Sequence, residues 1–274
     1  MTKSGLLAIM VFFAASIQPV IGADITVEKL GTGRLGIDLS GLAAAGGNAG
    51  TFRKVLEGDL SRSGWFDIAE KGRAGIVVVG SASADSGGDI AVACEVRNAA
   101  GTRRYLGQTY RDAGSNARKL AHKVADDIVF AVKGVKGIAS SRIAMFGRVN
   151  GQKDIFLCDA DGGNVTQITR EGAVISLALN WSPDCRALTY TSDINRFPDV
   201  YAVDLATWKR KRIMKYPGMN MGADISPDGR RIVFLEYQGS HDFFVGRSPQ
   251  VVKVVSPDGS GLRAVTPQVY SSKP

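Results

Sequence analysis

Histidine and cysteine are scarce in this sequence. Its 274 residues include only 2 histidines, His122 and His241, and 3 cysteines, Cys94, Cys158 and Cys185. No Cys-x-x-Cys pair occurs, so the sequence lacks the usual spacing of zinc ligands. The odd number of cysteines excludes a framework of disulfides, although a single bond between Cys158 and Cys185 stays open.

Motifs of several enzyme classes are also missing. There is no Gly-x-Ser-x-Gly nucleophile elbow, and the stretch GRSPQ at Gly246 lacks its second glycine. Neither a P-loop nor a dinucleotide fingerprint beside a suitable strand is found. His122 falls on a predicted helix, and His241 lies beside Asp242 in a predicted loop, which is too little for a catalytic dyad. We therefore expect no enzyme activity, no catalytic residues and no cofactor.

Long apolar runs are absent except at the N-terminus. Lys3 precedes an apolar run from Leu6 to Ile17, and Ile21-Gly22-Ala23 supplies small residues for cleavage. This pattern predicts a signal peptide over residues 1–23, because the run is too short to span a bilayer comfortably; a retained anchor is the alternative. No cysteine lies near the cut, which argues against a lipoprotein. The chain is therefore expected to be exported.

The net charge is +8, with lysine and arginine scattered along the chain. An exported protein rarely meets nucleic acid, so we expect no nucleic-acid partner. The one dense basic run, Lys209 to Arg212, is interpreted as a solvated hairpin end, with attraction to an anionic envelope or an acidic partner as the alternative.

Residues 24–138 alternate helical and strand patterns and predict a small α/β domain. Helices are expected over Asn48–Leu60, with Asn48 or Thr51 as cap, and over Asn116–Val132, capped by Ser115 and ended by Gly134. The predicted apolar stripes are Phe52, Val55, Leu56 and Leu60 in the first helix and Leu120, Val124, Ile128, Val129 and Val132 in the second. An extended piece is expected from Trp65 to Ile68, while 31–50 is rich in glycine and alanine and gives no clear prediction. The predicted strands are 75–80, 90–96 and 105–110.

After residue 140 the helical period disappears and two sequence patterns recur. WSPDCRALTYTS begins at Trp181 and ISPDGRRIVFLE begins at Ile225; strand–turn–strand stretches begin at Ile155, Val200 and Val252. Repeated units of four short strands every 40 to 45 residues are typical of a β-propeller. A β-sandwich with chance turns is the alternative. We predict a partial propeller over 139–274, with three units at about 141–180, 181–222 and 223–266.

Three units are fewer than propellers usually have, so a homodimer joining two arcs into one ring is a further hypothesis. The repeated turns have a local explanation, since proline fixes φ, aspartate accepts backbone hydrogen bonds and glycine adopts positive φ. Their aspartates could in principle bind Ca²⁺, but the spacing fits no known calcium loop, and we expect no metal site. The predicted structural turn residues are Ser182, Pro183, Asp184, Cys185, Ser226, Pro227, Asp228, Gly229, Asp159, Asp161 and Gly162.

Several segments in this order resemble the TolB family of the periplasmic Tol–Pal system. They include GDLSRSGWFDI at Gly58, GIVVVGSAS at Gly75 and, as the most specific piece, AHKVADDIVFAVKGVKGIASSRIAMF at Ala121. The resemblance covers the α/β domain but only about half of a six-bladed propeller with WD40-like (PD40) repeats. Cys185 also stands where the family usually has a turn glycine.

The resemblance implies a non-enzymatic periplasmic protein that supports outer-membrane integrity and constriction at cell division. Its implied partners are a Pal-like outer-membrane lipoprotein, which docks on the propeller, and a TolA-like inner-membrane protein. Association with the envelope would be peripheral. The implied TolA-binding strand is Asp24, Ile25, Thr26, Val27, Glu28 and Lys29. A degenerate copy without function and an accessory propeller of an exported hydrolase are the alternatives.

Overall fold

The computed structural model describes residues 33–44, 46–84, 88–214, 216–237, 249–267 and 269–270. These residues fall within one compact unit, Arg34–Pro274, apart from Gly33. The signal peptide predicted over 1–23 lies outside the described residues. The predicted division at residue 138 into an α/β domain and a partial propeller also stays a prediction.

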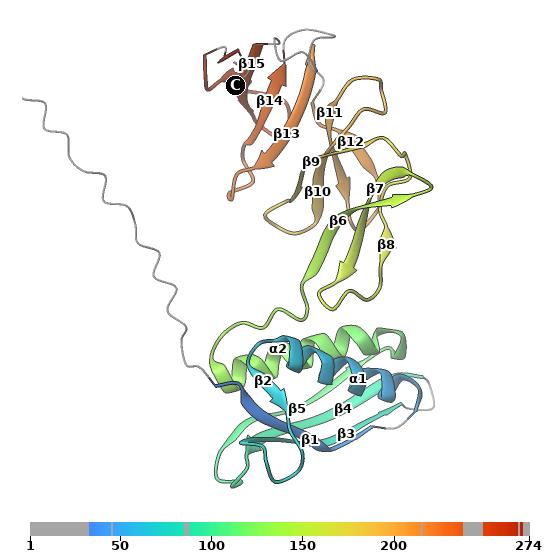
Figure 1. Cartoon of the computed structure of the whole chain (residues 1–274), viewed down its shortest axis with the longest axis vertical. Coiled ribbons are helices and arrows are strands. Elements are labelled where there is room, and N and C mark those ends of the chain that lie inside the picture. The colour runs from blue at the N-terminus through green and yellow to red at the C-terminus, as the bar shows by residue number, and fades with distance from the viewer. Residues whose placement is uncertain are drawn as a thin grey trace, which may run out of the picture. The chain divides into compact units, whose positions relative to one another are not determined.

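The first part of the unit is a five-stranded sheet covered on one face by two helices (Figure 1). The strand order is β2-β1-β3-β4-β5; β1 runs parallel to β2 and β3, and the remaining neighbours are antiparallel. The strands are β1 (Leu35–Ala44), β2 (Phe66–Ile68), β3 (Ile76–Ala84), β4 (Ile90–Asn98) and β5 (Arg104–Asp112). The sequence had not predicted β1, because its glycines and alanines hide the alternation expected of a strand.

Helix α1 (Gly47–Arg62) buries the predicted stripe, including Phe52 and Leu56. The predicted caps are wrong: the helix begins before both Asn48 and Thr51, its N-cap is Gly46, and no side chain caps it. Gly46 has φ 68°, a conformation that glycine adopts without strain. The Thr51 hydroxyl instead donates to the carbonyl of Gly47 from inside the helix.

Helix α2 (Ala117–Lys133) also buries its predicted apolar stripe on the sheet. Ser115 does not cap it, because a short 3-10 turn (η1, Gly114–Asn116) precedes the helix and Asn116 takes the N-cap position without a side-chain cap. The predicted stop at Gly134 is confirmed: this glycine has φ 72° and donates its N–H to the carbonyl of Phe130.

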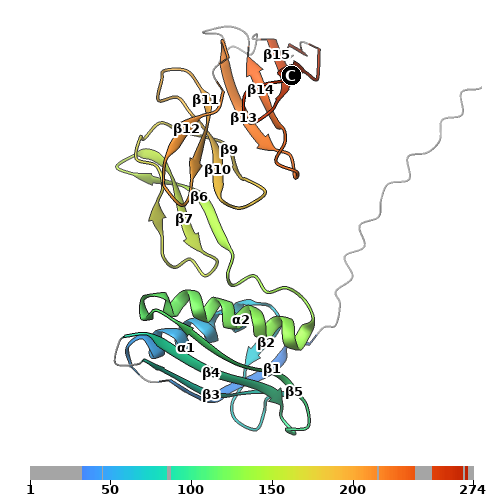
Figure 2. The ribbon, with the colours of Figure 1, turned by 180° about the vertical axis from the view of Figure 1, so that it is seen from behind.

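Three antiparallel sheets follow residue 140, and Figure 2 shows them from behind. The first contains β6 (Arg142–Val149), β7 (Gln152–Asp159) and β8 (Thr166–Gln167). The second contains β9 (Val174–Trp181), β10 (Ala187–Ser192), β11 (Asp199–Asp204) and β12 (Arg210–Arg212). The third contains β13 (Met219–Ile225), β14 (Ile232–Tyr237), β15 (Pro249–Val255), β16 (Arg263–Ala264) and β17 (Val269–Tyr270).

The structure confirms an α/β region followed by propeller-like sheets, but it corrects the borders of the predicted units. The predicted cuts at 181 and 223 separate β9 from β10 and β13 from β14, although each pair is joined in one sheet. The Ser-Pro-Asp turn thus connects two strands of the same sheet and does not open a unit. Among the described residues, the first sheet has no counterpart of β9 and β13.

Candidate functional site

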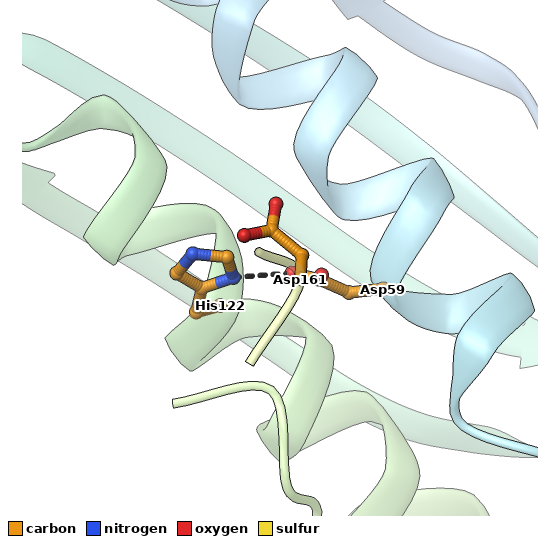
Figure 3. Close-up of side chains that lie close together, drawn as sticks. All are labelled: Asp59, His122 and Asp161. Carbon is orange, nitrogen blue, oxygen red and sulfur yellow. Dashed lines mark hydrogen bonds and ion pairs between the residues drawn. The ribbon is translucent and has the colours of Figure 1, made fainter. Parts of the chain in front are cut away.

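The TolA-binding strand implied by the resemblance, 24–29, lies outside the described residues. Within the described part, ionisable side chains gather at one place where the helices meet the first sheet after residue 140. Its members, here named the junction cluster, are Asp59, Arg62, Arg118, His122, Asp159 and Asp161. Asp59 and Arg62 come from α1, and Arg118 and His122 come from α2. Asp159 ends β7, and Asp161 lies in the turn that follows it. Figure 3 shows three of these side chains.

His122 lies at the centre of the junction cluster and is 4% exposed. Its Nδ1 is 2.6 Å from Asp59 Oδ2, and its Nε2 is 3.3 Å from Asp159 Oδ2. The hydrogen bond to Asp59 raises the pKa of His122, whereas burial opposes the shift. A ring between two carboxylates is best satisfied as an imidazolium that donates from both nitrogens. Neither nitrogen is then free to accept a proton from a substrate.

Asp161 is held by Arg118, the other basic residue that α2 contributes to the junction cluster. Arg118 Nη2 lies 2.8 Å from Asp161 Oδ1 and 2.6 Å from Oδ2, and the N–H of Gly163 donates to Oδ1 over 2.9 Å. Burial alone would raise the pKa of Asp161, but these hydrogen bonds and the charge of Arg118 outweigh it and lower the pKa. Asp161 is therefore ionised and bound to the helix.

Asp59, His122 and Asp161 offer ligand atoms within 4.8 Å of one another, as a metal ion would need. The surrounding contacts favour ion pairing instead. Arg62 Nη2 lies 2.9 Å from Asp59 Oδ1, and Arg118 binds Asp161. Three carboxylates in the cluster thus face two guanidinium groups and one imidazolium, so the charges are balanced without a cation. A metal ion would also lie beside two guanidinium groups, which repel it.

The junction cluster connects residues far apart in sequence. Arg118 and Asp161 are separated by 43 positions, and His122 and Asp59 by 63. The sequence had predicted Asp159 and Asp161 as turn residues, and the turn is present, since the N–H of Gly162 donates to the carbonyl of Asp159. It had not predicted their contact with the helices. The available signal was polar residues within the buried stripes, namely Asp59 in α1 and His122 in α2.

The two Ser-Pro-Asp turns have matching hydrogen bonds. Ser182 Oγ donates to Asp184 Oδ1 over 2.6 Å, and Ser226 Oγ donates to Asp228 Oδ1 over 2.5 Å. In each turn the aspartate also accepts the N–H two residues later. The serine hydroxyl contributes most to lowering the pKa of each aspartate. The oxygens of both turns are thus engaged locally, as expected of structural residues.

Cys185 adopts φ 56°, and the equivalent Gly229 adopts φ 70°. The cysteine therefore occupies a left-handed position where its Cβ crowds the backbone. All three cysteines are free, so the alternative of a bond between Cys158 and Cys185 is wrong. Cys94 and Cys158 are buried, and burial raises the pKa of Cys94 to about 12, which disfavours a thiolate there.

Comparisons with known proteins agree with this architecture. Residues 130–259 match the family model described as the TolB beta propeller domain. A Protein TolB homolog from Chlorobium luteolum is 26% identical over 93% of this chain and 62% of its own length. A Tol-Pal system protein TolB from Alcanivorax borkumensis is 31% identical over 57% of this chain and 37% of its own length.

The crystal structure of TolB from Acinetobacter baumannii shares the fold. It superposes with a TM-score of 0.73 at 21% identity, covering 85% of this chain and 61% of that protein. The chain thus spans less than two thirds of the length of each of these relatives. In the part of the chain that the structure describes, no helix has the length and apolar character needed to cross a membrane.

Proposed function

We propose that the chain is a TolB-family protein that serves in the periplasm as a non-enzymatic interaction protein of a Tol–Pal-type envelope system. The observation that carries this proposal is the alignment with a TolB homolog over 93% of the chain, which includes both the helix-covered sheet and the later sheets. The signal peptide predicted over 1–23 supports export.

We further propose two partners, a Pal-like outer-membrane lipoprotein and a TolA-like inner-membrane protein. The sheets after residue 140 supply the surface for the lipoprotein. The segment 24–29 (DITVEK) is rich in β-formers and is suited to pair with the edge of a partner's sheet. Through these contacts the protein would support outer-membrane integrity and constriction at division. A homodimer that joins two arcs of sheets stays a prediction, checked by light scattering.

The partners can be tested by co-purification from the native envelope. The tagged full-length chain is expressed in its own host, crosslinked in living cells and purified, and the associated proteins are identified by mass spectrometry. We expect to recover both partners. Deleting 24–29 should remove the TolA-like protein and leave the Pal-like lipoprotein, while a control with the six residues replaced by a Gly-Ser linker separates sequence from length.

Two results would contradict this assignment. Recovery of neither partner from a folded, exported chain would favour the alternative of a degenerate copy. Equal recovery of the TolA-like protein with and without 24–29 would place its binding surface elsewhere. Circular dichroism of the purified chain confirms folding in each case.

A further inference from the structure

A cavity of about 640 Å³ lies beside the junction cluster, between the start of α2 and the segment that leads into β6. We propose that this basic pocket, lined by Ser115, Lys119, Lys123, Ser140, Ser141 and Arg142, binds an acidic peptide segment of a partner protein. The inference rests on the proposed function only in taking the ligand to be a protein.

The charges around the basic pocket favour an anionic ligand. Four cationic residues line it, namely Arg118, Lys119, Lys123 and Arg142, against two acidic ones, Asp112 and Asp159. Both acids already have partners. Asp112 accepts hydrogen bonds from the N–H of Ala113 and from Asn116 Nδ2, and Asp159 contacts His122, Arg118 and Asn164. Arg118 and the imidazolium of His122, which also lines the pocket, are neutralised within the junction cluster, and Lys123 pairs with Asp127. The positive charge left for a ligand is therefore that of Lys119 and Arg142.

Several donors in the basic pocket are available. Lys119 is exposed and makes no hydrogen bond or ion pair with another described residue, and the same holds for the hydroxyl groups of Ser115, Ser140 and Ser141. Lys123 pairs with Asp127 over 2.9 Å at the surface. Exposed pairs of this kind are weak, so Lys123 can exchange Asp127 for a ligand carboxylate.

The spacing of the two lysines favours a peptide over a single small anion. Lys119 and Lys123 are four residues apart on α2, which places them about 6 Å apart along the helix axis. In an extended peptide, alternate residues are about 6.6 Å apart and point to the same side. Two acidic residues separated by one position therefore match the two lysines. Arg142 lies on a separate segment, over the ring of Trp181 and 3.4 Å from the carbonyl oxygen of Cys185. Neither contact neutralises its charge, so it offers a third cation that a single phosphate bound to the two lysines would not contact.

Fluorescence anisotropy with the full chain tests the proposal. The probe is a fluorescein-labelled hexapeptide with glutamate at alternate positions, and its glutamine counterpart serves as the reference. We expect K119Q/K123Q to raise the Kd of the peptide about tenfold. The variant loses two charge pairs with the peptide glutamates, and each pair contributes part of that increase. The control K71Q/K209Q removes the same charge from exposed lysines outside the pocket and should change Kd less than about twofold.

Each contrary outcome is distinct. Equal weakening by the two double variants would show attraction to net charge alone and overturn the proposal. Absence of binding to the folded wild-type chain would overturn it as well. A third outcome would assign the cavity to small anions instead. In that case inorganic phosphate displaces the peptide, K119Q/K123Q loses affinity for phosphate, and the length of the peptide has no effect on its Kd. None of these results bears on co-purification of the Pal-like and TolA-like partners, so the two proposals fail separately.

Discussion

The helix-covered sheet of residues 35–133 and the sheets after residue 140 bury different kinds of side chain. Among its described residues, the first forms one apolar cluster with 24 buried members, which both helices and all five strands supply. The later sheets form two smaller clusters of eight and six members. Much of the apolar burial therefore lies in the α/β region, even though the later sheets account for more of the described chain.

The later sheets bury more polar side chains than the α/β region does. Of the described residues, the α/β region buries Asp38, Asp59 and His122, whereas the later sheets bury Asp154, Thr169, Thr189, Thr191, Ser192, Asp199, Asn220 and Glu236. Several of these connect neighbouring segments; Asp199, for example, contacts Arg212 and Asn220. A buried polar group stabilises a fold only while its partners are present. The two regions should therefore respond to different substitutions.

The largest expected effect tests apolar burial in the α/β region. Phe52 is fully buried in the first cluster, and Phe52→Ala should lower the free energy of unfolding by about 3–5 kcal/mol, through lost transfer energy and a cavity. Urea unfolding followed by hydrogen exchange would locate the loss in residues 35–133. Phe130→Ala is the control, because Phe130 is 63% exposed and its loss should cost less than about 0.5 kcal/mol. Equal losses of stability in Phe52→Ala and Phe130→Ala would show that burial in the apolar cluster does not determine the stability of this region.

The next effect concerns the connection between the two regions. His122→Ala removes a partner of the buried Asp59 and should cost about 3 kcal/mol, because breaking a buried pair leaves a carboxylate less well compensated. Lys123→Ala, which removes an exposed pair with Asp127 and a contact over the Tyr110 ring, should cost about 0.5 kcal/mol. In His122→Ala, backbone amides should exchange faster both in α2 and in the turn after β7. A change confined to α2 would show that the junction cluster does not couple the regions.

His122 should also make the stability of the contact between the two regions depend on pH. Its folded pKa is raised above the ordinary 6.5, so its contribution to stability is fully present below about pH 6.5 and is lost as pH rises through the folded pKa. Urea midpoints measured between about pH 5.5 and 9 should therefore fall across this window in the wild type. His122→Ala should lack that decline. An identical decline in the variant would assign it to other groups.

A smaller effect tests the buried polar groups of the later sheets. Asp154 Oδ1 accepts hydrogen bonds from Thr169 Oγ1 at 2.8 Å and from the N–H of Glu171 at 3.1 Å. Asp154→Ala leaves these donors unsatisfied and should cost about 2 kcal/mol, with increased exchange between β7 and β9. Asp193→Ala serves as a surface control with little expected change. No loss from Asp154→Ala would indicate that apolar packing alone holds the first sheet.

The smallest effect compares equivalent turns of two sheets. Cys185→Gly should raise the unfolding free energy by about 0.5–1 kcal/mol, because glycine relieves the left-handed strain. Gly229→Cys, the reverse exchange at the matching position, should lower it by about 1 kcal/mol, since its Cβ would meet nothing within 4 Å and only the backbone strain remains. Thermal unfolding would check both signs. A fall in melting temperature for Cys185→Gly would contradict the strain.

Local features of this protein follow from its sequence. The stripes of α1 and α2, the stop at Gly134 and the Ser-Pro-Asp turns could be predicted, because each depends on residues only a few positions apart. The left-handed position of Cys185 also agrees with the turn glycine that the resembled family usually has there. Several segments that occur in the same order as in TolB proteins indicated the TolB family, and the comparisons support that assignment.

Long-range pairing was decided only by the tertiary structure. Parallel contacts with β2 and β3 define β1, although its glycine- and alanine-rich sequence gave no clear prediction. The union of β9 with β10 in one sheet corrected the predicted units. The junction cluster could not be predicted, because Asp59, His122 and Asp161 come from three separate elements and local patterns carry no information on which distant carboxylate meets which cation. Hydrogen bonds that the fold provides then raise the pKa of His122 and lower the pKa of Asp161 against the effect of burial, so the charges of these two groups also depend on the fold.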